Sequence, residues 1–190
     1  CFKLFFFSLI LIACHNQEEE ILETISFDLK KAKDINYSDI IADVNFIKLE
    51  TTNENLIGDI NLIRIVDNRI YILDSYRASS LFVFDLDGKF LFKIDKSGRG
   101  EGEYTSADYF QIKNGDIYIM DTYSRSDLYI YDSLGNFKRH KKINNRFTQF
   151  HFYGGDSIIA YVGNLENVNE QTGFNILYFS PDYEIIDKKM

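Results

Sequence analysis

Six side chains that could bind a ligand occur in two groups, separated by about 47 residues. Each group has a carboxylate, a tyrosine and an arginine, namely Asp74, Tyr76 and Arg77, then Asp121, Tyr123 and Arg125. A carboxylate can bind a cation or sugar hydroxyl groups, a tyrosine ring can stack on a sugar, and an arginine can contact an anion. We therefore take these six residues as candidate ligand-binding residues.

The same side chains also have a structural interpretation. Asp74 and Asp121 each follow an apolar strand, where a carboxylate can accept backbone N–H bonds and fix the next turn. A catalytic group is rarely duplicated from repeat to repeat, so this role is favoured for both. The recurring aromatic residues fit packing between sheets better than a row of sugar platforms.

Other reactive patterns are absent from the sequence. His140 and His151 have no metal-binding spacing, so no metal and no cofactor is expected. The glycine-rich segment 98–103 fails both phosphate-loop patterns, because no Lys-Ser/Thr follows its glycines and their spacing differs. No catalytic triad can be assembled, so no catalytic residue is assigned and a non-enzymatic role is favoured.

The two groups belong to a longer internal repeat. Segment 70–90 recurs at 117–137, with ten identical residues at an offset of 47. A fixed period of this length is typical of stacked supersecondary units. Alternating β-branched and aromatic residues predict strands, and Asp67-Asn68, Asp87-Gly88 and Asn114-Gly115 predict the turns between them.

Each unit can be divided into four strands. The first has 61–66, 69–73, 81–85 and 90–95, and the second has 109–113, 117–121, 128–132 and 137–142. A third unit uses 147–152, 157–162, 175–180 and 184–187, with a polar insertion over 163–173. We expect an all-β fold, a β-propeller of four-stranded antiparallel blades at about 60–95, 107–142 and 147–188, rather than a flat sandwich.

The N-terminal residues resemble a secretory signal. Lys3, an apolar run and Ala13 precede Cys14, and the Leu11–Cys14 segment resembles a bacterial lipobox. This predicts a signal over 1–14, with Cys14 lipidated, and a membrane anchor through that lipid. Because the sequence begins with Cys1, its start is expected to be incomplete. A tether and a strand at 24–29 would occupy 15–37, and a helical turn capped by Ser38 would span 38–42.

Charge limits the choice of partners. The formal net charge is −8, with 29 acidic and 21 basic side chains, so nucleic acid and anionic lipid surfaces would be repelled. Solubility is the favoured explanation of the charge. No nucleic-acid partner is expected.

A family resemblance rests on segments 70–90, 98–104 and 46–52. The first two are similar to NHL-like and TolB-like propeller repeats and their links, and the third is similar to six-bladed propeller lipoproteins of Gram-negative bacteria. The resemblance implies six blades, of which about three are present, so the chain is expected to be truncated at its end. Phe46–Glu50 is then the strand expected to close the ring.

The resemblance also implies a place and a role. It predicts an outer-membrane lipoprotein, periplasmic or surface-exposed, that binds or scaffolds an envelope protein or a glycan. The alternative is a glycan lyase or hydrolase with its catalytic channel residues in the missing half. A third alternative is a half-propeller that dimerises to close. One fold hosts many functions, so the choice depends on the site.

Overall fold

The computed structural model describes residue 26 and residues 28–163 and 173–189. It divides into two units, Cys1–Val44 and Asn45–Met190. The predicted signal, Cys14 and most of the polar insertion lie outside the described residues. In the part of the chain that is described, no helix is long and apolar enough to cross a membrane.

The first unit contains two short 3-10 helices. The helices are η1 (Leu29–Lys31) and η2 (Tyr37–Asp39). The strand expected over 24–29 is wrong where the residues are described, because Asp28 caps η1 by accepting from the Lys30 backbone N–H. The helical turn expected at 38–42 with Ser38 as its cap is wrong in its bounds and its cap: the observed turn is η2, its N-cap is Asn36, and the Asn36 N–H donates to the Asp39 carboxylate at 3.0 Å.

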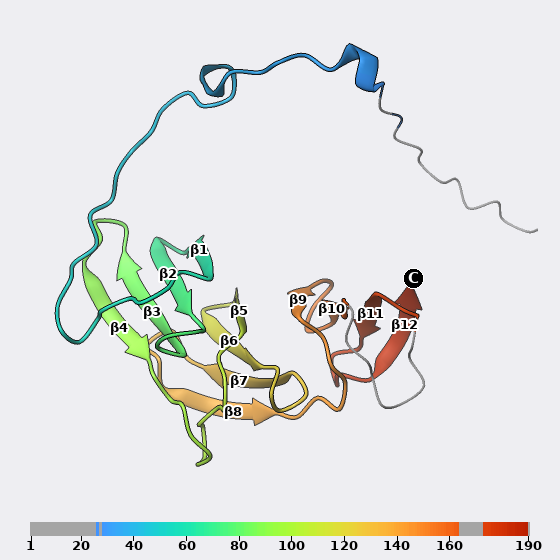
Figure 1. Cartoon of the computed structure of the whole chain (residues 1–190). Helices are drawn as coiled ribbons and strands as arrows, with labels where there is room; N and C mark the ends of the chain where they lie inside the picture. The colour runs from blue at the N-terminus through green and yellow to red at the C-terminus, as the bar shows by residue number, and fades with distance from the viewer. Residues whose placement is uncertain (1–25, 27, 164–172, 190) are drawn as a thin grey trace, which may run out of the picture. The chain divides into compact units, whose positions relative to one another are not determined.

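The second unit is all-β and consists of three four-stranded antiparallel sheets (Figure 1). The first sheet is β1 (Leu62–Val66), β2 (Arg69–Asp74), β3 (Ser80–Asp85) and β4 (Phe90–Ile94). The second is β5 (Tyr109–Lys113), β6 (Asp116–Asp121), β7 (Asp127–Tyr131) and β8 (Phe137–Lys141). The third is β9 (Gln149–Phe152), β10 (Ile158–Tyr161), β11 (Ile176–Phe179) and β12 (Ile185–Lys189).

The first hairpin of each repeat is set by its turn residues. Asp67 and Asn68 both have positive φ (50° and 58°), as do Asn114 and Gly115 (51° and 79°). Two consecutive left-handed residues match the twist of the flanking strands and fix the register of the pair. As a result, Ile65 pairs with Ile70 in the first sheet and Ile112 with Ile117 in the second.

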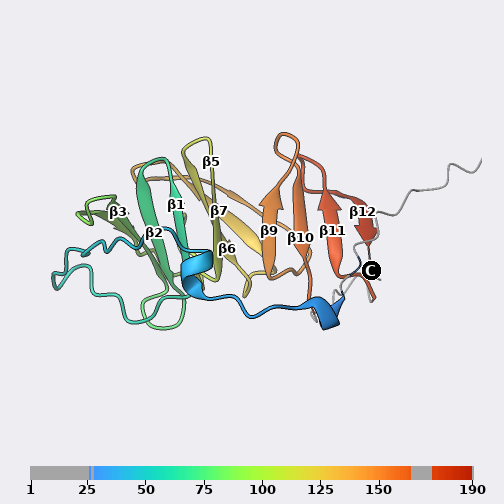
Figure 2. The same ribbon diagram turned by 90° about the horizontal axis from the view of Figure 1, so that it is seen from above.

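Successive side chains of a strand point to opposite faces of its sheet, so one sheet can pack apolar side chains against a neighbour on each face. The three sheets pack face to face in this way. Tyr71 and Leu73 of the first sheet share a buried cluster with Ile117 and Ile119 of the second. Tyr118, which lies between Ile117 and Ile119 on β6, points to the opposite face and belongs to a buried cluster shared with the third sheet. The second sheet is therefore buried on both faces, and Figures 1 and 2 show β1, β5 and β9 as the first strands of successive sheets.

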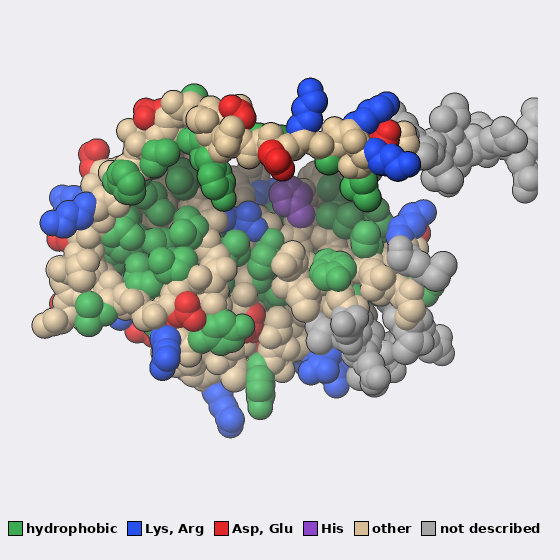
Figure 3. Space-filling view, turned by 45° about the horizontal axis from the view of Figure 1, so that its top comes forward, with side chains coloured by type: hydrophobic (Ala, Val, Ile, Leu, Met, Phe, Trp, Pro, Cys, Tyr) green, Lys and Arg blue, Asp and Glu red, His purple; other side chains and the backbone are tan. Residues whose placement is uncertain are grey.

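The other face of the first sheet is only partly covered. Ile70 and Phe84 are buried there under Leu49 and Ile57, but Ile63 and Ile65 are 50% and 63% exposed. Apolar side chains are correspondingly visible over this sheet in the space-filling view (Figure 3).

The expected closing strand at Phe46–Glu50 forms no strand. Its hydrogen bonds go instead to the β3–β4 turn, where the Glu50 N–H donates to the Gly88 carbonyl at 2.7 Å. The Glu50 carboxylate accepts from the Phe90 N–H at 2.9 Å. The segment is therefore bonded to a turn of the first sheet, and its role as the strand that closes a ring stays a prediction.

Candidate functional site

The loop that follows β2, which we name the first corner (Asp74–Ser79), is fixed by Asp74. This carboxylate is fully buried and accepts four backbone N–H bonds, from Gly58, Asp59, Arg77 and Ala78, at 2.8 to 3.1 Å. Burial raises the pKa of Asp74, but the four N–H bonds outweigh it and leave the pKa below its usual value. Each oxygen has two donors, which favours the turn-fixing interpretation.

The equivalent loop after β6, the second corner (Asp121–Ser126), is built in the same way. Asp121 is fully buried and accepts from the backbone N–H groups of Thr105, Tyr123 and Ser124 at 2.7 to 3.2 Å. The hydroxyl groups of Ser106 and Ser124 also donate to it. The Asp121 carboxylate therefore holds both its own corner and the segment that leads into the second sheet by hydrogen bonds.

The corners differ in their backbone. Arg125 and Ser126 both have positive φ (63° and 65°), whereas in the first corner only Ser79 does (47°). A left-handed conformation costs a non-glycine residue about 1 to 2 kcal/mol. Ser126 is held by two bonds to Phe147, because its hydroxyl accepts from the Phe147 N–H and donates to the Phe147 carbonyl, both at 2.9 Å.

The remaining predicted ligand residues lie on the surface of these corners. Tyr76 and Tyr123 are 81% and 80% exposed, and Arg77 and Arg125 are also exposed. Tyr123 and Arg125 line a cavity of about 360 Å³, the corner pocket, completed by Ser124, Asp127 and residues 142–144. The structure therefore places two of the six candidate residues together at a cavity.

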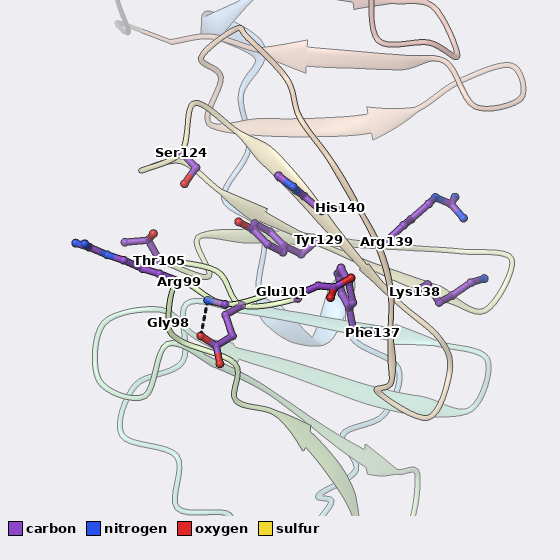
Figure 4. A pocket seen from close by; sticks show the side chains of 13 residues that line it. Gly98, Arg99, Glu101, Thr105, Ser124, Tyr129, Phe137, Lys138, Arg139 and His140 are labelled. Carbon is purple, nitrogen blue, oxygen red and sulfur yellow. Dashed lines mark hydrogen bonds between the residues drawn. The ribbon is translucent and has the colours of Figure 1, made fainter.

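A larger cavity of about 680 Å³, the loop pocket, lies on the other side of Ser124. It is lined by residues 98–103 and 137–140, with Thr105, Ser124 and Tyr129. Figure 4 shows Tyr129 and His140 next to each other in this pocket, with Arg99 extending to one side and Lys138 and Arg139 to the other. The glycine-rich segment holds its own shape, since Glu103 accepts from the Gly100 N–H at 2.8 Å.

Asp127 connects the two cavities. It is 4% exposed, lines the corner pocket and contacts His140 Nε2 in the loop pocket at 3.1 Å. Its other oxygen accepts from the Ile143 N–H at 2.8 Å. The His140 ring stacks on Tyr129 at 4.5 Å between centroids, so both its position and its tilt are fixed. Burial, with the charges of Asp121 and Asp127, raises the pKa of Tyr129.

Basic side chains outnumber acidic ones around the two pockets. Their linings contain five Lys or Arg side chains, Arg99, Arg125, Lys138, Arg139 and Lys142, against three acidic ones, Glu101, Glu103 and Asp127. The whole chain has the opposite balance, at −8. The aromatic and imidazole rings between these charges can contact a sugar face, and the cations can pair with carboxylates. This chemistry suits an acidic ligand.

Sequence reasoning found part of this site. The repeat indicated Tyr123 and Arg125, but Asp127 and His140 were not assigned, because the pairing of β7 with β8 brings them together. The only sign in the sequence was that Asp127 lies between Ser126 and the strand predicted at 128–132. Within the described ranges, no group of three or more His, Cys, Asp or Glu side chains is arranged to hold a metal.

Comparison with known protein families identifies the family of the chain. The model of a domain of unknown function (DUF4934) matches residues 22–190. The chain belongs to the DUF4934 family. The match covers the whole second unit, so both pockets lie in the family domain, whose function is not defined by its description.

A solved structure resembles this DUF4934 chain. It is the crystal structure of a protein from Bacteroides fragilis NCTC 9343, described as a candidate exported protein, with a TM-score of 0.72 and 25% identity. The match covers 83% of this chain and 44% of that one, so this chain spans less than half the length of the solved structure. No curated protein matches it.

Proposed function

We propose that this DUF4934 chain is part of an exported lipoprotein that binds an acidic glycan at the bacterial outer membrane. The observation that carries the ligand class is the excess of Lys and Arg over acidic side chains in the linings of the loop and corner pockets, in a chain of net charge −8. The loop pocket, at about 680 Å³, falls in the range typical of small-molecule sites.

Export is supported from two sides. The signal-like segment 1–14 ends in Cys14, and the structural relative from Bacteroides fragilis is described as a candidate exported protein. The lipid at Cys14 would anchor the chain, and the tether of residues 15–23 would separate the sheets from the membrane.

The proposed architecture is a six-bladed, NHL-like propeller of which the three sheets are part. It is supported by three equivalent four-stranded sheets packed face to face. It is also supported by first strands β1, β5 and β9 that follow one another along one side. In this arrangement the two corners lie on the same rim, because each follows the second strand of its sheet.

Calorimetric titration with an acidic oligosaccharide, an oligogalacturonide, tests the ligand class, with a neutral galactan as the paired ligand. We expect the acidic ligand to bind and the affinity to fall about tenfold or more when Arg99 and Arg125 are both replaced by Ala, since two charged contacts are lost. Lys89→Ala, an exposed charge at the far end of the first sheet, is the matched control. If the neutral galactan bound as tightly as the oligogalacturonide, the proposed acidic ligand class would be wrong.

Lipidation is tested separately. Mass spectrometry of the mature N-terminus should find a lipid on Cys14, and Cys14→Ala should move the protein from the membrane to the soluble fraction. Retention of the variant in the membrane would exclude the proposed anchor without affecting the glycan proposal.

The Asp127–His140 contact favours one alternative, a glycan lyase or hydrolase. An Asp that holds one imidazole nitrogen leaves the other able to take a proton from a substrate. If the alternative holds, new chain ends appear when the oligogalacturonide is incubated with the protein, and His140→Gln abolishes them while binding persists. Unchanged oligosaccharide after prolonged incubation would leave binding as the function.

A further inference from the structure

A second set of polar side chains lies on the first strands of the three sheets, away from the corners. Arg64 on β1 donates to the Phe110 carbonyl on β5 through Nε at 3.2 Å. Gln111 on β5 donates to the Phe150 carbonyl on β9 through Nε2 at 2.8 Å. Arg64 and Gln111 are 47 residues apart, which is the period of the repeat, so each side chain ties its sheet to an edge carbonyl of the next.

The repeat shows that this tie requires no charge. The neutral amide of Gln111 makes the same kind of bond that Arg64 makes. Arg64 nevertheless places a half-buried guanidinium at this position, over the rings of Tyr109 and Phe110 at 5.4 and 5.7 Å. Across residues 26, 28–163 and 173–189, no carboxylate forms an ion pair with it. The positive charge is therefore unexplained by the fold.

The hydrogen-bond partners around Arg64 are unbalanced. The Tyr109 hydroxyl oxygen accepts from Arg64 Nη2 at 2.7 Å and from Gln111 Nε2 at 3.2 Å. Both of its lone pairs are thus used, and its own O–H has no acceptor among the described side chains and backbone. Arg64 has five N–H groups and uses two of them, so three more remain available.

His151 lies next to this set of donors. Its Nδ1 lies 3.5 Å from Gln111 Nε2. The two hydrogens of Gln111 Nε2 already donate to the Phe150 carbonyl and the Tyr109 hydroxyl, so this longer contact does not assign the ring proton of His151 to either nitrogen. Three N–H groups of Arg64 and the O–H of Tyr109 therefore have no acceptor among the described residues, and His151 lies beside them.

A cavity next to these donors is mostly apolar. It measures about 210 Å³ and is lined by Tyr109 and His151 together with Phe150, Ile159, Tyr161 and Ile176 among others. This volume suits one small ring or a short aliphatic chain, and the polar side chains in its lining include Tyr109, Gln149 and His151.

From these observations we propose that the first strands form a second binding site, which takes a small apolar carboxylic acid. The carboxylate accepts from Arg64 and Tyr109, and the apolar body occupies the cavity between β5 and the third sheet, beside His151. A carboxylate neutralises the guanidinium and supplies the acceptor that the Tyr109 hydroxyl lacks. The site shares no residue with the corner or loop pocket, so it stands independently of the glycan proposal.

The probe is sodium benzoate, with benzyl alcohol as a neutral ligand of similar size. Titration is followed through the Nε–H signal of Arg64 in ¹H–¹⁵N spectra of the full chain at constant ionic strength. We expect a saturable shift of this signal with benzoate and none with benzyl alcohol. Shifts confined to arginines of the corners, or equal shifts with the two probes, would overturn the proposal.

Variants then test the two roles of Arg64. Arg64→Gln copies the residue at the equivalent repeat position, so it should keep the tie to Phe110 and the melting temperature while benzoate affinity falls about tenfold or more. Tyr109→Phe removes only the hydroxyl and should also weaken binding. Arg77→Gln, the same charge change in the first corner, should leave binding unaltered. Wild-type affinity in both Arg64→Gln and Tyr109→Phe would show that these side chains serve only the fold.

Discussion

The first and second corners have the same framework but different surroundings. In each, a buried aspartate binds backbone N–H groups of its own loop and of the chain that enters the sheet. In the first corner, Tyr76 and Arg77 extend into solvent and line neither the loop pocket nor the corner pocket. In the second, Tyr123 and Arg125 border a cavity, and two consecutive residues are left-handed.

This difference shows which parts of the repeat carry the fold and which parts are available for binding. The aspartate and the serine five residues later are kept, and both serines tie their corner to the following segment. Ser79 accepts from the Ala107 N–H, and Ser126 binds Phe147. The residues between them differ in conformation, and only the second corner lies between pockets.

Replacing the two aspartates should have the largest effect. Asp74→Ala and Asp121→Ala each remove a buried carboxylate that accepts from at least three backbone N–H groups, so each should lower the free energy of unfolding by about 3 kcal/mol or more. Urea denaturation of the two variants measures this. A loss under about 1 kcal/mol at either position would show that the corners do not depend equally on their carboxylates.

Replacing the serine of each corner should lower stability by different amounts. Ser126→Ala leaves both the N–H and the carbonyl of Phe147 without their partner, and Ser79→Ala leaves only the Ala107 N–H. We expect losses of about 2 and about 1 kcal/mol, respectively. Thermal unfolding of the pair provides the measurement, and equal losses would contradict the closer tie assigned to the second corner.

Lowering the pH should remove the stabilisation that the ionised Asp74 carboxylate provides. Its pKa is held below the usual 3.8, so the stabilisation it provides is complete above that pH and is lost as the pH falls through the lowered pKa. Asp74→Asn has no such proton to bind. The difference in unfolding free energy between wild type and Asp74→Asn, measured in urea at pH 7 and pH 3, should therefore shrink at the lower pH. A constant difference would exclude the lowered pKa.

The smallest effect, and one of opposite sign, is expected at the arginines. Arg125→Gly should raise stability by about 1 kcal/mol, because glycine adopts φ 63° without strain. Arg77, which is not left-handed, is the matched control, and Arg77→Gly should lower stability slightly by adding flexibility to the unfolded chain. Calorimetric melting resolves both signs. Two changes of the same sign would show that the second corner stores no strain.

The strands could be predicted from the sequence because their information is local. Alternation and the Asp67-Asn68 and Asn114-Gly115 turns placed the central strands of the first two sheets within about one residue. At Phe46–Glu50 the same local signal accompanies a segment that bonds to the β3–β4 turn, and its expected role as a closing strand stays a prediction. Local pattern shows that a segment is extended, but its partner is decided by tertiary packing.

The candidate sites were only partly predictable. Tyr123 and Arg125 could be found through the repeat, and the role of Asp121 in its turn follows from its position after a strand. His140 lies in no recognisable motif, because it reaches Asp127 across a strand pair. Arg64 could have been compared with Gln111 by applying the 47-residue period to the first strands, but its lack of an acidic partner is visible only in three dimensions.

The fixed frame of each corner also affects how this family can change over time. The aspartate and serine hold the loop by bonds to backbone atoms, which every amino acid supplies. Side chains at positions such as Tyr76 and Tyr123 can therefore be exchanged without disturbing the sheets. A duplicated unit would inherit a folded corner whose exposed residues are free to acquire a new specificity, one repeat at a time.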